Sequence, residues 1–175
     1  MDSCAFKRLM LPHYRRMYVT AMTILRNSDD ASDAVQEAFT RLWEKRNDLP
    51  NIDNPEAYCV TITKRICIDR IRRGTLPIDE VTEDTLLIAD DSDMQADNRE
   101  SLQLITHLMR QLPEQQRQVL QLRAFNDCSL DEIESITGLT GVNVRTLLSR
   151  GRRRFMVRGA FRTPSIDDIR IVAPP

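Results

Sequence analysis

The sequence predicts an all-α protein made of two small helical bundles joined by an acidic linker, the second containing a helix-turn-helix. Apolar residues recur at spacings of three and four along most of the chain, which is the pattern of amphipathic helices. Glycine and aromatic residues are few, with five glycines among 175 residues. Residues 74–100 contain nine acidic residues and one basic residue, so a strongly acidic stretch separates two basic halves of the chain.

The first bundle starts with a helix predicted over residues 5–25. Its apolar stripe consists of Met10, Tyr14, Met17, Ala21, Ile24 and Leu25. Pro12 either weakens the first turns of this helix or starts it, because proline has no N–H to donate. Residues 27–30 (NSDD) then break the chain and supply N-cap candidates and early negative charge for a second helix, which runs to about Lys45.

A third helix is predicted from Asn54 to about Arg73. Asn54 suits the N-cap, and Pro55 suits the first helical position, where its fixed φ is already helical. Gly74 is placed to close the helix. The predicted buried stripe is Cys59, Ile62 and Ile66.

The second bundle contains two predicted helices, over residues 102–112 and 114–125, with a proline between them. Ser129 and Glu132 then form an S-x-x-E capping box at the start of a short helix. Gly138 is placed to end that helix, and the last helix follows after Thr140. The predicted inner stripe of the last helix is Val144, Leu147, Leu148 and Gly151.

The last helix is rich in arginine. Residues 141–162 contain seven arginines and no acidic residue. A short capped helix, a glycine break and a cationic second helix together predict a helix-turn-helix, which places its second helix in the DNA major groove. Asn143, Arg145 and Ser149 are candidates to reach base edges, since Asn and Arg pair bidentately with adenine and guanine. Phosphate contacts are expected from Arg150, Arg152, Arg153 and Arg154.

Other polar groups leave alternatives open. The basic group near the end of the third helix either binds nucleic acid or favours the helix dipole; its members are Lys64, Arg65, Arg70, Arg72 and Arg73. Tyr58 either stacks on an unpaired base or anchors its helix. The polar face of the second helix lacks the positive charge that DNA would need, so it indicates a protein partner.

Several classes of protein are disfavoured. The four cysteines contain no C-x-x-C pair and lie far from both histidines, so we predict no metal site, and Cys59 and Cys67 serve as apolar fillers. No glycine-rich phosphate loop and no nucleophile with its base are visible, so we expect neither an enzyme nor a cofactor. No apolar run approaches the roughly 20 residues that span a bilayer, and no signal segment begins the chain, so we expect a cytoplasmic protein without direct membrane insertion.

Four segments closely resemble the extracytoplasmic-function (ECF) sigma factors of the sigma-70 family. Residues 30–43 (DASDAVQEAFTRLW) resemble the segment that docks on the clamp helices of the largest subunit of RNA polymerase. Residues 54–73 resemble the family's −10-element helix. Residues 112–120 (LPEQQRQVL) and 129–154 resemble its −35-binding domain. The resemblance spans about residues 5–160, with the motifs in the family's order.

The resemblance implies a factor that binds core RNA polymerase and directs promoter-specific transcription initiation by recognising −10 and −35 elements. It divides the chain into a region 2-like domain (1–74), the acidic linker (75–98), a region 4-like domain (99–162) and a flexible tail (163–175). The linker would run through polymerase channels or repel DNA from the free protein. Promoter DNA and an anti-sigma factor, with a membrane-bound one among the options, would be the further partners.

The resemblance also implies residue roles. Polymerase contacts would come from Asp33, Gln36, Glu37 and Arg41, with Phe39, Leu42 and Trp43 mainly packing behind them. The melted −10 strand would meet the loop 51–54 together with Asn54, Tyr58, Lys64, Arg65, Arg72 and Arg73. The −35 duplex would be read by Asn143, Arg145, Thr146, Ser149, Arg150 and Arg153.

Three positions depart from the family pattern. Arg65 stands where the family usually has Asn, which affects −10 base specificity. Val142 replaces the usual Gly or small residue, and Glu134 stands where Ala is common, and both affect −35 reading. Two other functions remain as alternatives: a two-domain regulator that binds a palindrome through the arginine-rich helix alone, and a helical scaffold that binds proteins and never DNA. Substitutions at Asp33 and Gln36 discriminate among the three.

Overall fold

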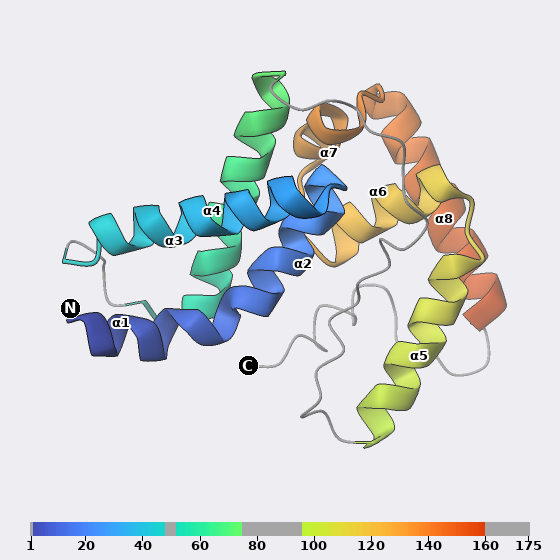
Figure 1. Ribbon diagram of the computed structural model, residues 1–175. Helices are drawn as coiled ribbons and strands as arrows, with labels where there is room; N and C mark the ends of the chain where they lie inside the picture. The colour runs from blue at the N-terminus through green and yellow to red at the C-terminus, as the bar shows by residue number, and fades with distance from the viewer. Residues whose placement is uncertain (1, 48–51, 75–95, 160–175) are drawn as a thin grey trace. The chain divides into compact units, whose positions relative to one another are not determined.

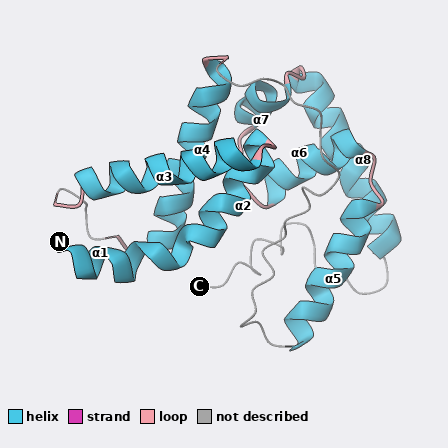
Figure 2. Ribbon diagram, viewed as in Figure 1, coloured by secondary structure: helices cyan, strands magenta, loops and turns pink. Residues whose placement is uncertain are grey.

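The computed structural model describes residues 2–47, 52–74 and 96–159, and every regular element in these ranges is helical (Figure 2). The all-α fold class is therefore confirmed. The chain forms two compact units, residues 1–89 and 90–175. Unit 1 contains α1 (Ser3–Met10), the 3-10 helix η1 (Leu11–His13), α2 (Tyr14–Leu25), α3 (Ser28–Glu44) and α4 (Pro55–Arg72) (Figure 1). Unit 2 contains α5 (Ala96–Arg110), α6 (Glu114–Ala124), α7 (Leu130–Thr137) and α8 (Gly141–Gly159).

The prediction of one helix over residues 5–25 is wrong, because Pro12 divides that segment into α1, η1 and α2. Proline cannot donate the backbone hydrogen bond that would continue α1. The 3-10 turn then advances three residues per turn instead of 3.6, which shifts the apolar face. Tyr14, predicted in the buried stripe, is accordingly 45% exposed, whereas Met10 and Met17 are fully buried.

The predicted starts of the second and third helices of unit 1 are confirmed by their caps. Asn27 accepts hydrogen bonds from the backbone N–H groups of Asp29 and Asp30 at 2.9 and 3.1 Å. The Asn54 side chain accepts from the N–H of Ala57 at 2.9 Å, and Pro55 is the first residue of α4. Each bond satisfies a helix-terminal donor that has no partner within the helix.

The core of unit 1 lies where α2 packs against both α3 and α4. Its fully buried large side chains include Met10, Met17, Val35, Leu42 and Ile66. The filler role predicted for the cysteines agrees with their burial: Cys59 and Cys67 are fully enclosed, and the Cys59 thiol donates to the Met10 sulfur at 3.5 Å. Burial raises the pKa of the Cys59 thiol to about 11. Ile62, predicted in the same stripe, is only half-buried.

Unit 2 is built around the packing of α8 against α6 and α7. Val144, Leu148 and Phe155 are buried along one side of α8. Gly151 lies on the same side, and a Cβ there would come within 2.7 Å of the Leu120 side chain on α6. Glycine at position 151 therefore allows the two helices to approach closely.

The predicted helix-turn-helix is present, with α7 and α8 as its two helices. The capping box is complete: Ser129 N–H donates to the Glu132 carboxylate at 2.7 Å, and Glu132 N–H donates to the Ser129 hydroxyl at 3.1 Å. Gly138 adopts φ +69°, a left-handed conformation that ends α7, and α8 begins at Gly141. Most of the predicted linker and the predicted tail lie outside the described residues, although α5 begins within the expected linker range, at Ala96.

Candidate functional site

The two faces of α8 differ sharply in composition. Its buried side carries only Val144, Leu148, Gly151 and Phe155 among the described side chains. The exposed side chains are Val142, Asn143, Arg145, Thr146, Ser149, Arg150, Arg152, Arg153 and Arg154. All six residues predicted to read the −35 duplex are therefore accessible, and no acidic residue interrupts them.

A central line runs along the exposed face of α8. Val142, Thr146, Ser149 and Arg153 are spaced by four, three and four residues, which places them above one another on a helix of 3.6 residues per turn. The Thr146 hydroxyl donates to the Val142 carbonyl at 2.8 Å. Its hydrogen is therefore used within the helix, and its methyl group and oxygen lone pairs remain for an external contact.

A hollow opens beside this line, lined by α6, the start of α7 and α8. Its lining residues are Arg123, Leu130, Arg145, Leu148, Ser149, Arg152 and Arg153. Four of the seven lining residues are arginines and none is acidic, so the hollow suits an anion such as a phosphate. Arg123 was missed by the sequence reasoning. Its guanidinium donates to the Cys128 carbonyl at 2.8 Å, in the loop that precedes α7, and no local sequence signal places it there.

Glu134 of α7 lies against the first residue of α8. A Cβ at Gly141 would collide with the Glu134 carboxylate, so only glycine allows this contact. The contact places a negative charge beside the N-terminus of α8, where the helix dipole favours it. Glu134, which departs from the family pattern, is thus accommodated because residue 141 has no side chain.

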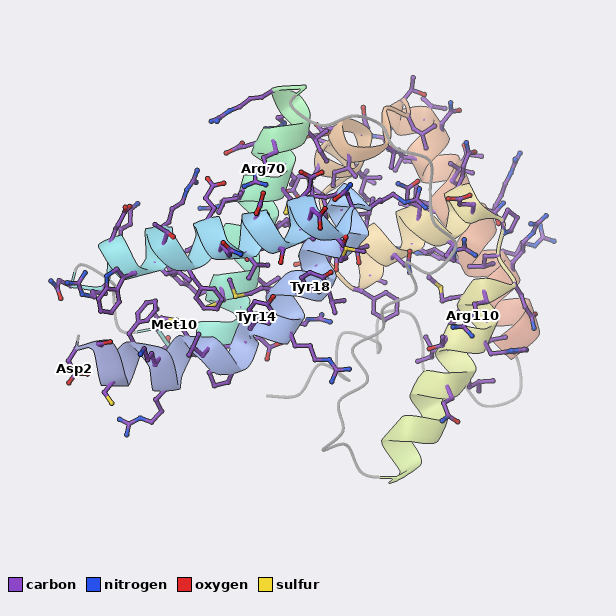
Figure 3. The ribbon with its side chains drawn as sticks, viewed as in Figure 1. Asp2, Met10, Tyr14, Tyr18, Arg70 and Arg110 are labelled. Carbon is purple, nitrogen blue, oxygen red and sulfur yellow. The ribbon has the colours of Figure 1, made fainter. Side chains whose placement is uncertain are left out.

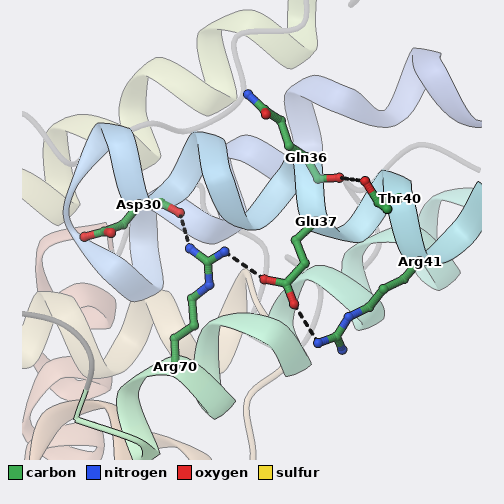
Figure 4. A network of polar contacts seen from close by, with 6 residues as sticks. All are labelled: Asp30, Gln36, Glu37, Thr40, Arg41 and Arg70. Atoms are coloured by element: carbon green, nitrogen blue, oxygen red, sulfur yellow. Dashed lines mark hydrogen bonds and ion pairs between the residues drawn. The ribbon is translucent and has the colours of Figure 1, made fainter.

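On α3, the predicted polymerase-binding residues point in two directions. Asp33, Gln36 and Arg41 are exposed, whereas Glu37 is half-buried. The Arg41 side chain turns towards Glu37, which in turn meets Arg70 of α4 (Figure 4). The Glu37 carboxylate accepts from Arg70 of α4 at 2.7 Å and from Arg41 at 2.6 Å, so both of its oxygens are engaged. The hydrogen bond from Arg70 lowers the pKa of the Glu37 carboxyl.

Arg70 also donates to the Asp30 carbonyl at 3.2 Å, which ties α4 to the first turn of α3 as well. We call Glu37, Arg41 and Arg70 the α3–α4 ion-pair network. The network joins residues that are 33 positions apart in sequence. The sequence placed Arg70 in a basic group near the end of its helix. In the structure Arg70 makes its contacts inside unit 1.

Aromatic side chains cover the other flank of α3. Phe39 is half-buried, and its ring is stacked on Tyr14 with the ring centroids 6.3 Å apart. Tyr14 is also stacked on Tyr18, again with the centroids 6.3 Å apart (Figure 3). The rings of Trp43 and Phe6 pack edge to face with their centroids 5.1 Å apart. The central carbon of the Arg46 guanidinium lies 4.0 Å from the centroid of the Trp43 ring. These contacts agree with the packing role that the resemblance implies for Phe39 and Trp43.

The predicted −10 residues lie along α4. Tyr58, Arg65 and Arg72 are spaced by seven and therefore share one stripe of the helix, with Tyr58 half-buried and both arginines exposed. Lys64 is half-buried, and Arg73 is exposed at the helix end. Asn54 caps α4 through its side chain, as described above. Residue 51 of the predicted loop lies outside the described residues.

Residues 2–47, 52–74 and 96–159 contain neither a cluster of metal-ligating side chains nor a membrane-spanning helix. Within these ranges no three His, Cys, Asp or Glu residues come together as a metal site. No helix in the same ranges is both long enough and apolar enough to cross a bilayer.

Comparison with known proteins identifies the two units. Residues 9–76 match the profile of Sigma-70 region 2, and residues 102–155 match that of Sigma-70 region 4. The chain is 27% identical over 149 residues to the RNA polymerase sigma factor SigV of Bacillus subtilis, covering 83% of this chain and 86% of SigV. It is 26% identical over 153 residues to the ECF RNA polymerase sigma factor SigM of Mycobacterium tuberculosis, covering 87% and 76% of the two chains.

Among solved structures, the chain aligns with the sigma factor RpoE from Bartonella quintana, crystallised in complex with the anti-sigma factor NepR. The TM-score is 0.47 and the identity 18%, over 91% of this chain and 99% of RpoE. Both sigma region matches fall on the helices described above, region 2 in unit 1 and region 4 on the helix-turn-helix of unit 2. The chain therefore belongs to the sigma-70 family of RNA polymerase sigma factors, in its extracytoplasmic-function group.

Proposed function

We propose that the chain binds core RNA polymerase and directs it to promoters, with unit 1 contacting polymerase and the −10 element and unit 2 contacting the −35 element. The observation that carries this proposal is the presence of regions 2 and 4 in one chain, the second with an exposed helix face free of acidic residues. Sigma factors catalyse no reaction themselves, so we propose no catalytic residue and no cofactor.

In unit 2, the N-terminal half of α8 enters the major groove and the arginines bind the backbone. Asn143 and Arg145 lie on opposite flanks of the central line, where each can pair bidentately with a base edge. Thr146 contributes through its methyl group, and Ser149 and Arg150 follow on the next turn. Phosphates are bound by Arg152, Arg153 and Arg154, together with Arg123 across the hollow.

In unit 1, the melted −10 strand runs along the exposed stripe of α4. Tyr58 offers a ring on which an unpaired base can stack, and Arg65 and Arg72 supply positive charge along the same stripe. Lys64 and Arg73 flank it. Capture of an unstacked base would offset a few kcal/mol of unstacking, which couples binding to promoter opening.

The polymerase contact is made by the exposed face of α3. Asp33 and Gln36 present their side chains outward and meet the clamp helices of the largest polymerase subunit. Arg41 is 47% exposed and contributes at the edge of this contact. Glu37 has both oxygens engaged, so its main role is to hold α3 against α4 and thereby fix the polymerase-binding face relative to the −10 stripe.

Two further properties belong to the same proposal. The protein acts in the cytoplasm, where core polymerase and promoter DNA are found. An anti-sigma factor, membrane-bound or not, is a partner that occupies these surfaces and blocks initiation, as the resemblance to ECF sigma factors implies.

The test is co-purification with core polymerase. The double variant Asp33→Asn, Gln36→Ala should lose polymerase binding while its unit 2 still binds −35 duplex DNA. Gln115→Ala, which removes another exposed glutamine, from α6, is the matched control and should bind polymerase normally. Wild-type protein that binds promoter DNA but never core polymerase would instead support the free-standing regulator.

A further inference from the structure

Val142 is an exposed apolar side chain at the tip of the helix that enters the DNA. It is 70% exposed, whereas the other exposed large hydrophobics in the described residues range from 37% to 50%. It occupies the second position of α8, and N-terminal residues of a recognition helix are the ones that contact base edges. At this exposure the apolar side chain is largely in contact with water in the free protein.

The surroundings of Val142 make this tip apolar. Val142 heads the central line of α8, and Thr146 follows it one turn later. Because the Thr146 hydroxyl donates to the Val142 carbonyl at 2.8 Å, its hydrogen is not available to a base. Gly141 has no side chain. The first turn of the central line thus presents methyl groups and offers no side-chain hydrogen-bond donor.

The charge beside the tip argues against a phosphate at the same place. The Glu134 carboxylate lies against Gly141, at the N-terminus of α8. A helix N-terminus normally attracts anions, but here a carboxylate already lies beside the first residue of the helix and would repel a phosphate. Base edges, which carry no net charge, remain as the partner of the Val142 surface.

We propose that Val142 is a specificity-determining residue that contacts the C5-methyl group of a thymine in the −35 element. Thymine is the one base that presents a methyl group in the major groove, and apolar side chains recognise it by contact. Val142 thereby selects an A·T pair at one position of the −35 element, next to the base pairs that Asn143 and Arg145 contact by hydrogen bonds. This inference rests on the proposed function of unit 2.

The experiment removes the methyl group from the DNA one thymine at a time. Full-length protein with core polymerase is bound to a promoter fragment that it transcribes, and each thymine of either strand across the −35 element is replaced by deoxyuridine. We expect wild-type affinity to fall about fourfold at one thymine, the ratio that corresponds to withdrawing one methyl group from an apolar contact. Other positions should change little.

Variants assign the effect to Val142. Val142→Ala keeps the helix and should bind the unmodified and the deoxyuridine promoters with equal affinity. That affinity should match the affinity of the wild-type protein for the deoxyuridine promoter. Val142→Thr keeps one methyl group and should retain part of the discrimination. A flat scan with wild-type protein, a −35 element without thymine on either strand, or an equal loss in Val142→Ala would each overturn the inference. Absence of binding and transcription on every unmodified promoter would instead overturn the proposed function itself.

Discussion

Glu37→Gln should destabilise unit 1 by about 1 kcal/mol, because it removes the charge at the centre of the α3–α4 ion-pair network. The amide that replaces the carboxylate has nearly the same shape and can still accept one hydrogen bond from Arg70. The substitution therefore measures the contribution of the charge while leaving the packing of α3 on α4 in place.

The magnitude follows from the geometry and exposure of the pair. Hydrogen bonds to charged groups contribute about 1.5–3 kcal/mol when water is excluded. The Glu37 and Arg70 side chains are 34% and 23% exposed, so solvent screening reduces the value towards the ~0.2–1 kcal/mol of surface pairs. Arg41 is 47% exposed and lies one turn from Glu37, so Arg41→Gln should cost only about 0.3–0.5 kcal/mol.

The assay is urea unfolding followed by tryptophan fluorescence. Trp43 is the only tryptophan of the chain and lies in unit 1, packed against Phe6 and Arg46, so its signal reports this unit alone. A double-mutant cycle of Glu37→Gln with Arg70→Gln should give a coupling free energy of about 0.5–0.7 kcal/mol, which is the loss that remains once the contribution of Arg41 is subtracted.

Three results would refute this reasoning. A loss below about 0.3 kcal/mol for Glu37→Gln would mean that the network adds nothing beyond a surface pair. A coupling free energy near zero would mean that Arg70 is not the partner. A larger cost for Arg41→Gln than for Glu37→Gln would place the main contact within α3 and not between the helices.

Three further predictions concern pH, the turn of unit 2 and salt. Arg70 lowers the pKa of the Glu37 carboxyl in the folded state, so the carboxylate adds stability above its ordinary pKa of 4.5. That stability is lost as the pH falls through the folded pKa. The difference in urea midpoint between wild type and Glu37→Gln should therefore shrink below pH 4.5. Gly141→Ala should change the free energy of unfolding by less than about 1 kcal/mol in thermal unfolding followed by circular dichroism, because the Glu134 carboxylate ends a flexible side chain and can turn away from the new Cβ, while alanine suits a helix better than glycine. A loss above about 2 kcal/mol would mean that Glu134 is held in place against α8. Arg123→Gln should weaken DNA binding equally on all promoters and reduce the slope of log affinity against log salt by about 0.9, whereas a promoter-dependent effect would mean that Arg123 reads bases.

Features set by a few neighbouring residues were predictable from the sequence. The caps at Asn27 and Asn54 and the box formed by Ser129 and Glu132 are local hydrogen bonds within three residues, so the pattern alone indicates them. The same holds for Gly138, whose left-handed φ only glycine adopts easily. The arginine-rich face of α8 was predictable for a similar reason, since one helix carries all of it.

Features that join distant residues were not predictable. Glu37 was expected on the polymerase contact, yet Arg70 on another helix engages it, and nothing in the spacing of the two residues signals this. Arg123 reaches the hollow only because α6 packs against α8. Tyr14 fitted the helical period, but the 3-10 turn at Pro12 moved it to the surface. In each case packing, and not local pattern, decides the position.

Transcription by the reconstituted complex is the measurement on which the whole interpretation depends. Core RNA polymerase, with and without this protein, is given a genomic promoter library, and the transcripts are sequenced. We expect new start sites only when the protein is present, upstream of which two sequence blocks recur at a fixed spacing. The Asp33→Asn, Gln36→Ala variant should lose every one of them. Start sites that are unchanged by the protein, or that persist in this variant, would contradict the assignment of its two units to one promoter-reading factor.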